Sequence, residues 1–244
     1  MTFVHGKGAV VLMDQYDVSA YLKSTYWTAD RDLPDTTTLG NSGKRRQVSG
    51  LKDGSISFAG LHDSGAGATY PVLVAALSAA SGNVVTDFPE AGATAATTIG
   101  KPARLVSARE KTFKSGSPVD GVVPANADFS ADGGVDFGVS LHALAAETAT
   151  GDSARVDQVA SANGGVGHIH ATASAGTPTL DAIIQHSDDH ITWLDLITFA
   201  QLTGVGKERK EVVAGTAVKM YIRETHTIGG GTPSITYAVA FARR

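Results

Sequence analysis

The side chains of this chain with the clearest capacity for chemistry are histidines and carboxylates in its second half. His168 and His170 are separated by one residue, so on a strand their side chains point to the same face. The run HSDDH adds His186, Asp188, Asp189 and His190. Imidazole nitrogens and carboxylate oxygens together bind divalent metals. Because Asp is common in turns, SDDHITW also fits a turn between two strands, and we expect no metal site.

A second group, GLHDSGAG, places His62, Asp63 and Ser64 next to one another. A catalytic triad needs such side chains to converge in space, whereas their adjacency fits a strand end followed by a glycine-rich turn. The sequence has no Gly-x-Ser-x-Gly elbow and no Gly-x-x-x-x-Gly-Lys-Ser/Thr phosphate loop. IGGGTP, residues 228–233, lacks a following helix and is interpreted as a hairpin loop. We therefore expect a protein that is not an enzyme and that uses no cofactor.

Composition narrows the class of protein further. The 244 residues carry a net charge of −4, which argues against a basic surface for nucleic acid. The absence of cysteine removes disulfides and thiolate-bound zinc. The N-terminus has no secretory pattern, and no apolar run reaches the ~20 residues that span a bilayer. We expect synthesis in the cytoplasm and no membrane partner.

The pattern of apolar residues predicts a mainly β chain. In the run 135–141, Val135 and Phe137 alternate with Asp136, which predicts an apolar face and a polar face. Further predicted strands are residues 9–13, 18–22, 55–61, 103–113, 167–173, 180–186, 192–199, 218–222 and 235–241.

One helix and one domain boundary are also predicted. YPVLVAALSAASG has Pro71 near its first turn and Gly82 just past its end, which is typical of a helix. Its apolar stripe consists of Leu73, Ala76, Leu77 and Ala80 and is expected to lie on a sheet. The small, polar run at residues 145–155 suggests a boundary between domains of residues 1–150 and 151–244.

The stretch RDLPDTTTLGNSGKRRQVSG, residues 31–50, is long, polar and turn-prone. Loops of more than ~12–15 residues without structure of their own are usually functional or disordered. Leu33 and Leu39 are its apolar anchors, and Lys44, Arg45 and Arg46 form its basic cluster.

Two groups of motifs resemble a known family. DVSAYL, DTTTLG and GLKDGSISFAGLHD, followed by the apolar helix, resemble the N-terminal half of major tail tube proteins of long, non-contractile-tailed bacteriophages (siphophages). IIQHSDDHITWLDLITF, GKERKEVVAGTAVKMYIRE and SITYAVAFARR resemble the β-rich C-terminal region of actinobacteriophage-type tail proteins. Leu39 stands where an aromatic residue is common in the family.

The resemblance implies a structural virion protein of the phage tail. Its subunits would form rings, typically hexameric, that stack into a tube through which genomic double-stranded DNA passes. The implied fold is a tail-tube β-sandwich or partly open barrel with one flanking α-helix, followed by a C-terminal β-sandwich domain that decorates the exterior. Implied partners are further copies of the chain, the tape measure protein, the tail terminator and distal tail proteins.

The resemblance also assigns expected roles to residues. The segment 31–50 is expected to reach neighbouring subunits or rings, through Arg31, Asp32, Leu33, Asp35, Leu39, Lys44, Arg45 and Arg46. The basic cluster is expected to pair with acidic residues of a neighbour, such as Asp30, Asp32 or Asp35. Because a lumen must not grip DNA, Glu110 and Asp136 are candidates to line it, the alternative being an ordinary solvated face.

Two other functions stay open from the sequence. The first is a carbohydrate-binding β-sandwich protein of a virion or cell surface, with Trp193 as an aromatic platform; the alternative for this Trp is core packing among apolar neighbours. The second is a metal-dependent hydrolase that uses His168, His170 and His186.

Overall fold

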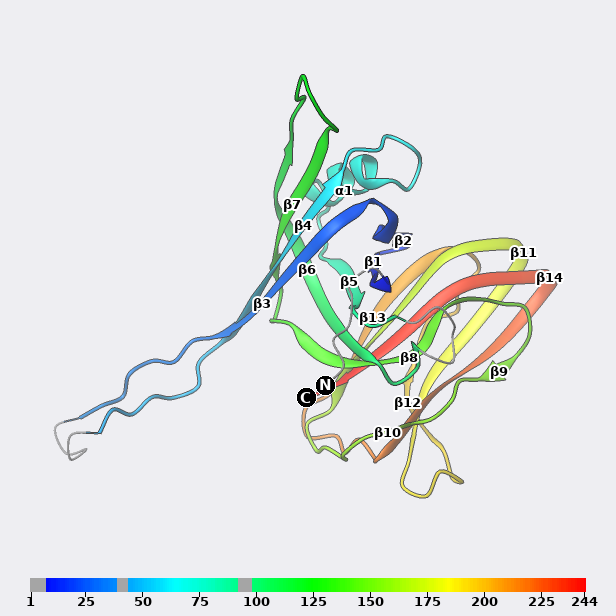
Figure 1. Cartoon of the computed structure of the whole chain (residues 1–244). Helices are drawn as coiled ribbons and strands as arrows, with labels where there is room; N and C mark the ends of the chain where they lie inside the picture. Colours follow the sequence, from blue (N-terminus) through cyan, green and yellow to red (C-terminus); the bar gives the residue numbers. More distant parts are fainter. Residues whose placement is uncertain (1–7, 39–43, 92–97) are drawn as a thin grey trace.

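The computed structural model describes residues 8–38, 44–91 and 98–244, so the predicted anchor Leu39 lies outside the described residues. Within them the chain is mainly β, as expected, with one α-helix (Figure 1). None of the described helices is long and apolar enough to cross a membrane. The first elements are β1 (Val10–Met13), β2 (Tyr16–Asp17), a 3-10 turn η2 (Ser19–Tyr21), β3 (Leu22–Arg31), β4 (Lys52–Leu61), α1 (Thr69–Leu77), β5 (Asn83–Phe88), β6 (Pro102–Ser115) and β7 (Pro124–Ala131). Then follow β8 (Asp136–Glu147), β9 (Gly151–Asp152), β10 (Val156–Asp157), β11 (Gly165–Ser187), β12 (Leu194–Thr198), β13 (Gly206–Val212) and β14 (Tyr221–Arg243).

The strands form one continuous open sheet that does not close into a barrel. Its main path is β12-β11-β14-β8-β6-β5-β1-β2, and β7, β4 and β3 branch from β6 in that order. Strand β8 joins the two halves of the chain, because its start pairs with β6 and the rest pairs with β14. The predicted boundary at residues 145–155 begins inside β8 and also contains β9, both paired with β14. A division into two domains at this point stays a prediction.

The helix formed where the sequence predicts it, with its buried face shifted. Helix α1 ends at Leu77 and buries Val72, Leu73 and Ala76 against the core formed by β4, β6 and β7. Leu77 is exposed, and Ala80 lies beyond the helix end, so neither belongs to the packed stripe. The helix therefore covers the sheet as expected.

The predicted strand at residues 18–22 is wrong. Ser19–Tyr21 form a 3-10 turn instead, because Asp17 accepts hydrogen bonds from both the backbone and the hydroxyl of Ser19. Short polar side chains that bond the local backbone favour turns over extended strands.

The predicted hairpin loop at residues 228–233 is also wrong, because this run lies inside strand β14. β11 and β14 pair with each other over nearly their whole lengths. Each is therefore one long strand, although the sequence pattern predicts two shorter strands in its place. The ribbon that they form bends back on itself. The Tyr237 hydroxyl donates to Glu224 Oε1 at 2.9 Å, although 13 residues separate them and a straight strand would hold them roughly 40 Å apart. Gly176 and Gly230 stand at the bend with positive φ of 73° and 106°.

The bend creates a core between the two halves of the ribbon. Its members include Leu180, Ile184 and Ile222 from one half and Ile169 and Phe241 from the other. Strand β8 contributes to the same core through Leu141. The second half of the chain is thus stabilised by apolar burial inside a folded two-stranded ribbon.

Candidate assembly interface

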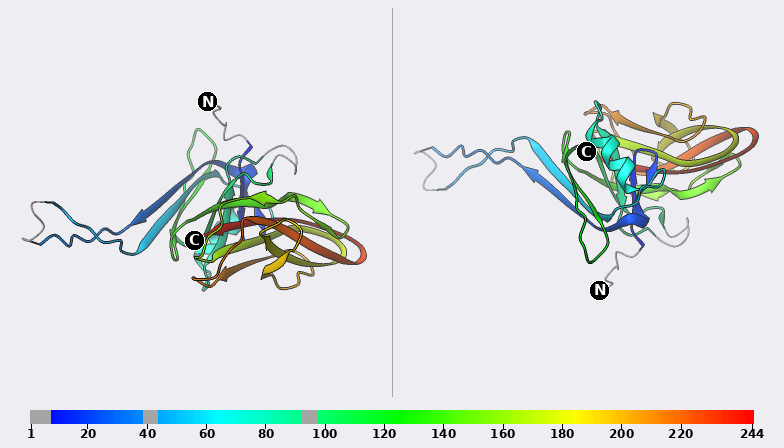
Figure 2. Two further views of the ribbon diagram at one scale, coloured as in Figure 1. Left: turned by 90° about the horizontal axis from the view of Figure 1, so that it is seen from below. Right: turned by 90° about the horizontal axis from the view of Figure 1, so that it is seen from above.

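Residues 31–38 and 44–51 continue the β3–β4 hairpin into a two-stranded projection, which we call the arm. The Asp32 amide donates to Leu51 O at 2.9 Å, the Val48 amide donates to Pro34 O at 3.1 Å, and Asp35 pairs with Gln47. The arm extends away from the body of the molecule in all views (Figures 1 and 2). The described part of the polar segment that the sequence singles out is therefore paired with itself.

Side chains near the far end of the arm fix its register. Arg45 Nε donates to Asp35 Oδ2 at 2.9 Å, and the Thr37 amide donates to Asp35 Oδ1 at 2.8 Å. Hydrogen bonds from Thr37 and then from Arg45 lower the pKa of Asp35. Arg45 thus pairs with an acid of its own chain. Lys44 and Arg46 make no ion pair with any other described residue, and their pairing with a neighbouring subunit stays a prediction.

The arm also presents apolar side chains to water. Leu33 is 53% exposed, Val48 is 55% exposed and Leu51 is 80% exposed. Tyr26, on β3 at the base of the arm, is exposed as well. Apolar side chains gathered on a thin projection have no interior to pack into, so a partner must cover them if they are to leave water.

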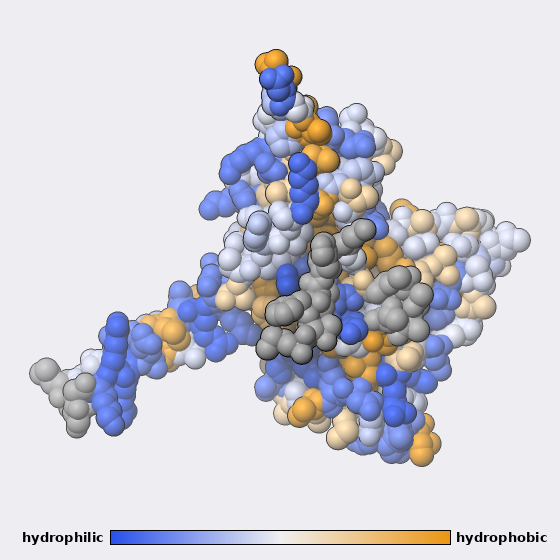
Figure 3. All heavy atoms as spheres, in the orientation of Figure 1, coloured by the Kyte–Doolittle hydropathy of each residue, from blue (hydrophilic) through white to orange (hydrophobic). Residues whose placement is uncertain are grey.

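A second projection is the β6–β7 hairpin, whose connection contains the exposed Val119 and Val122. Apolar side chains gather at the upper end of the molecule in Figure 3, at the tip of this hairpin. The molecule therefore has two protruding hairpins with uncovered apolar residues.

The two residues proposed to line a lumen have different surroundings. Both carboxylate oxygens of Glu110 are buried and have no hydrogen-bond partner among the described residues, and burial raises its pKa to about 8. Asp136 is buried and accepts two hydrogen bonds from Arg244, at 3.0 and 2.8 Å, while Phe137 is exposed. At the start of β8 the predicted pattern is thus reversed: Asp136, expected on the polar face, is buried, and Phe137, expected on the apolar face, is exposed. The ion pair with Arg244 holds Asp136 inside. Whether either residue faces a lumen stays a prediction.

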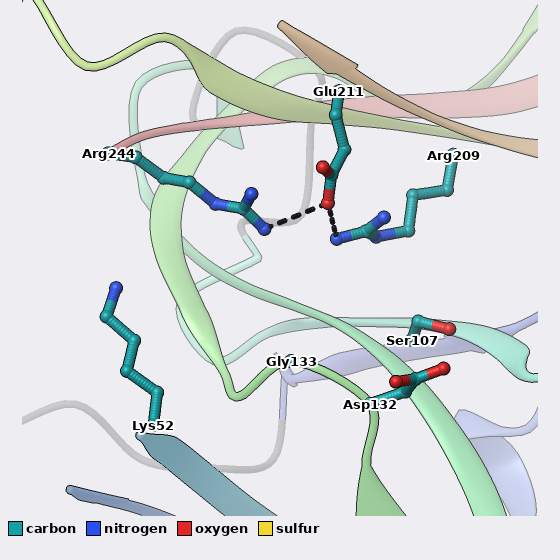
Figure 4. Close-up of a pocket in the computed structure, with 7 residues that line it drawn as sticks. All are labelled: Lys52, Ser107, Asp132, Gly133, Arg209, Glu211 and Arg244. Atoms are coloured by element: carbon teal, nitrogen blue, oxygen red, sulfur yellow. Dashed lines mark hydrogen bonds and ion pairs between the residues drawn. The ribbon is translucent and has the colours of Figure 1, made fainter. Parts of the chain in front are cut away.

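A charged cavity of about 400 Å³ lies near the base of the arm (Figure 4). It is lined by Lys52, Ser107, Asp132, Gly133, Arg209, Glu211 and Arg244. Arg209 and Arg244 donate to Glu211 Oε1 at 2.6 and 3.1 Å. Burial raises the pKa of Glu211, but these two guanidinium groups outweigh it and hold the pKa below its usual value. A carboxylate held ionised in this way is a structural link between β13 and the chain end, not a proton donor.

The predicted metal group is divided between different parts of the structure. His168 and His170 share a face of β11, as expected. However, the Thr86 hydroxyl lies within hydrogen-bond distance of His168 Nδ1, at 2.9 Å, and of His170 Nε2, at 2.7 Å. His186 lies near the other end of β11, where its Nδ1 accepts the Lys219 amide at 3.2 Å. Asp189 accepts the backbone amides of Ile191 and Thr192, so SDDHITW forms the turn that the sequence suggests.

Trp193 lies in the same region and is partly exposed, so it is not the core Trp of the alternative interpretation. The guanidinium of Arg223 lies over its ring at 4.3 Å. One face of the ring is therefore covered by a cation–π contact, and a role in glycan binding stays a prediction.

The adjacent residues His62, Asp63 and Ser64 form part of a turn. The His62 ring packs against Tyr70 at 4.7 Å, and Asp63 Oδ1 accepts the Gly65 amide at 2.7 Å. The Asp63 side chain therefore caps the turn, as the glycine-rich sequence suggests.

The sequence interpretation missed a buried group made of His142, Glu224 and His226. Glu224 and His226 are separated by one residue, as are His168 and His170. The spacing that singled out the first pair in the sequence could therefore also have found the second. The sequence does not show that β8 pairs with the second half of β14, or that the bend brings the first half of β14, with Glu224 and His226, back to His142.

No protein-family model matches the chain, and no curated protein matches it. Solved structures do match at low identity. The virion of a native gene transfer agent particle matches at 16% identity and a TM-score of 0.45, covering 55% of this chain and 98% of that chain. The SPP1 tail tube matches at 10% identity and a TM-score of 0.43, covering 55% and 78%.

The crystal structure of the SPP1 Dit protein spans more of the chain. It matches at 11% identity and a TM-score of 0.37, covering 96% of this chain and 98% of that chain. These scores mark distant likenesses.

Proposed function

We propose that this chain is a structural subunit of a phage tail tube, which self-assembles into stacked rings. The observation that carries the proposal is the arm, with its own ladder of hydrogen bonds and its uncovered Leu33, Val48 and Leu51. A projecting hairpin offers unpaired backbone edges and apolar side chains to a neighbour. The order of the DVSAYL, DTTTLG and GLKDGS motifs supports the same function.

The kind of contact that an arm makes determines the geometry of the assembly. An arm that docks on a different surface of the next copy forms a heterologous interface, and such interfaces close into rings or continue as helical filaments. We propose hexameric rings whose lumen passes double-stranded DNA, with residues 151–244 on the exterior. Tape measure, terminator and distal tail proteins are the proposed partners in the virion.

Negative-stain microscopy and analytical ultracentrifugation of the concentrated chain test this proposal. We expect rings or tubes from the unmodified chain, because the arm then buries its apolar residues against a neighbour. A variant with Leu33→Ser, Val48→Ser and Leu51→Ser should stay monomeric with a nearly unchanged melting temperature, since these positions are exposed in the monomer.

The matched control replaces three exposed apolar residues elsewhere, Val159→Ser, Ile191→Ser and Val213→Ser, and should still assemble. If the arm variant also formed tubes, the arm would not be part of the interface. A chain that stays monomeric at every concentration, even with tail-assembly partners present, would overturn the proposed function.

A further inference from the structure

Two histidines and a glutamate meet in the interior of the bent β11–β14 ribbon. Glu224 and His226 lie on β14, and His142 lies on β8. All three are buried, with 0%, 6% and 5% of their surface exposed. One potential ligand atom from each lies within 4.8 Å of the others. In residues 8–38, 44–91 and 98–244, no other group of His, Asp and Glu approaches this closely.

The tautomer of His142 is fixed by the main chain. Its Nδ1 lies 2.8 Å from Ala143 O, and a carbonyl oxygen only accepts, so Nδ1 carries the hydrogen. The other nitrogen, Nε2, lies 3.4 Å from Glu147 Oε1. In the neutral ring this nitrogen holds a lone pair, which is directed at a carboxylate.

His226 has the same arrangement with its nitrogens exchanged. Its Nε2 lies 3.2 Å from Ala149 O and therefore carries a hydrogen. Its Nδ1 lies 3.2 and 3.3 Å from the two carboxylate oxygens of Glu224. In both histidines, then, a nitrogen lone pair faces a carboxylate. Such contacts are attractive only when a positive charge, either a proton or a metal ion, lies between the two groups.

We propose that these three residues form a zinc site, in which His142 Nε2, His226 Nδ1 and the Glu224 carboxylate bind the ion. Two imidazoles and a carboxylate are ligands that Zn²⁺ accepts. A tetrahedral site with bonds of about 2.0–2.1 Å sets its ligand atoms roughly 3.3 Å apart. The His226–Glu224 separation of 3.2 Å fits this spacing.

The surroundings complete the arrangement expected around such a site. Ligating histidines commonly donate their second ring N–H to a backbone carbonyl, as both histidines do here. The Tyr237 hydroxyl donates to Glu224 Oε1 at 2.9 Å and orients the carboxylate. Glu147 is 34% exposed, which leaves a route for the ion.

The ion would fasten β8 to the first half of β14, across the fold of the ribbon. The unfolded chain does not hold these residues together, so zinc would bind the folded state preferentially and raise its stability. This inference does not depend on assembly into a tube.

The test uses the full chain, stripped with a chelator and then equilibrated with Zn²⁺. We expect one zinc per chain by elemental analysis after desalting, and a melting temperature that rises with zinc concentration. His142→Gln and His226→Gln should each lose the bound zinc and the thermal shift. The matched control His190→Gln removes an exposed histidine from the SDDHITW turn and should retain both.

A chain that retains no zinc, or variants that all bind it equally, would overturn the site and leave two histidine–carboxylate contacts. If the variants fail to fold, Co²⁺ bound to the unmodified chain decides the matter. A tetrahedral visible spectrum supports the site, and the spectrum of the hydrated ion overturns it.

Discussion

At the scale of single residues, Glu110 shows how burial acts on a carboxyl group without a partner. Its two oxygens lie among β6 and its neighbours with no hydrogen bond from another described residue, and its pKa rises to about 8. The folded chain therefore keeps a proton on Glu110 at neutral pH that the unfolded chain has already lost.

We predict that Glu110→Gln changes the dependence of stability on pH. Between pH 4.5 and about 8 the folded state binds the extra proton, so the free energy of unfolding falls as pH rises through this window. The variant should lack this fall and exceed the unmodified chain above pH 8 by about 1 kcal/mol, a value reduced because solvent reaches the residue. Urea unfolding from pH 5 to 9 measures it.

The control for this prediction is Lys111→Gln, which replaces the ionisable side chain at the next, exposed position. Its pH dependence should match that of the unmodified chain. Equal pH profiles for the Glu110 variant and the unmodified chain would contradict the assignment.

At the scale of elements, the bend of the β11–β14 ribbon depends on glycine. A Cβ at Gly230 would lie 1.8 Å from Thr177 O, and the residue has a φ of 106°. Any larger residue at this position would therefore overlap with the paired strand, and its backbone would be strained in the left-handed region.

We predict that Gly230→Ala lowers the free energy of unfolding by more than about 3 kcal/mol, because the backbone of β11 must move to admit the methyl group. Gly215→Ala is the matched control, since Gly215 also has a positive φ, 91°, but open space around its Cβ position. It should cost only about 1–2 kcal/mol. Equal losses in denaturant unfolding would show that backbone strain alone matters at the bend.

At the scale of the whole molecule, the fold of the monomer does not depend on the arm, whereas the proposed assembly does. Neither of the two large core clusters contains a residue of the arm. Its charged residues are exposed, and the Arg45–Asp35 pair is a surface ion pair of the kind that contributes little to monomer stability.

We predict that Lys44→Glu, Arg45→Glu and Arg46→Glu together leave the monomer folded and impair tube growth, since the arm then repels acidic residues of a neighbour. Assembly of the unmodified chain should also weaken as salt rises, because exposed pairs are screened. Light scattering and microscopy across a salt series measure both effects.

The control is a variant with the same change in charge outside both projections, Lys23→Glu, Lys101→Glu and Arg155→Glu, all at exposed residues. It should assemble. If the arm variant forms tubes as well as this control does, the basic cluster lies outside the interface.

By itself the sequence determined the class of the fold, the presence of a helix within residues 70–82, where α1 ends earlier, at Leu77, and most strand positions. These depend on short-range periodicity and on residues such as Pro71, which act locally. The motif order that resembles tail tube proteins was also visible there, as was the unusual character of residues 31–50.

Only the tertiary structure decided which segments join and which side chains meet. The run at residues 228–233 became a bend instead of a loop, because β11 pairs with β14 on both sides of it. Asp136 became buried because Arg244, at the far end of the chain, reaches it. His142 and His226 came together because β8 pairs with the second half of β14 and the bend returns the first half, and no local pattern encodes either.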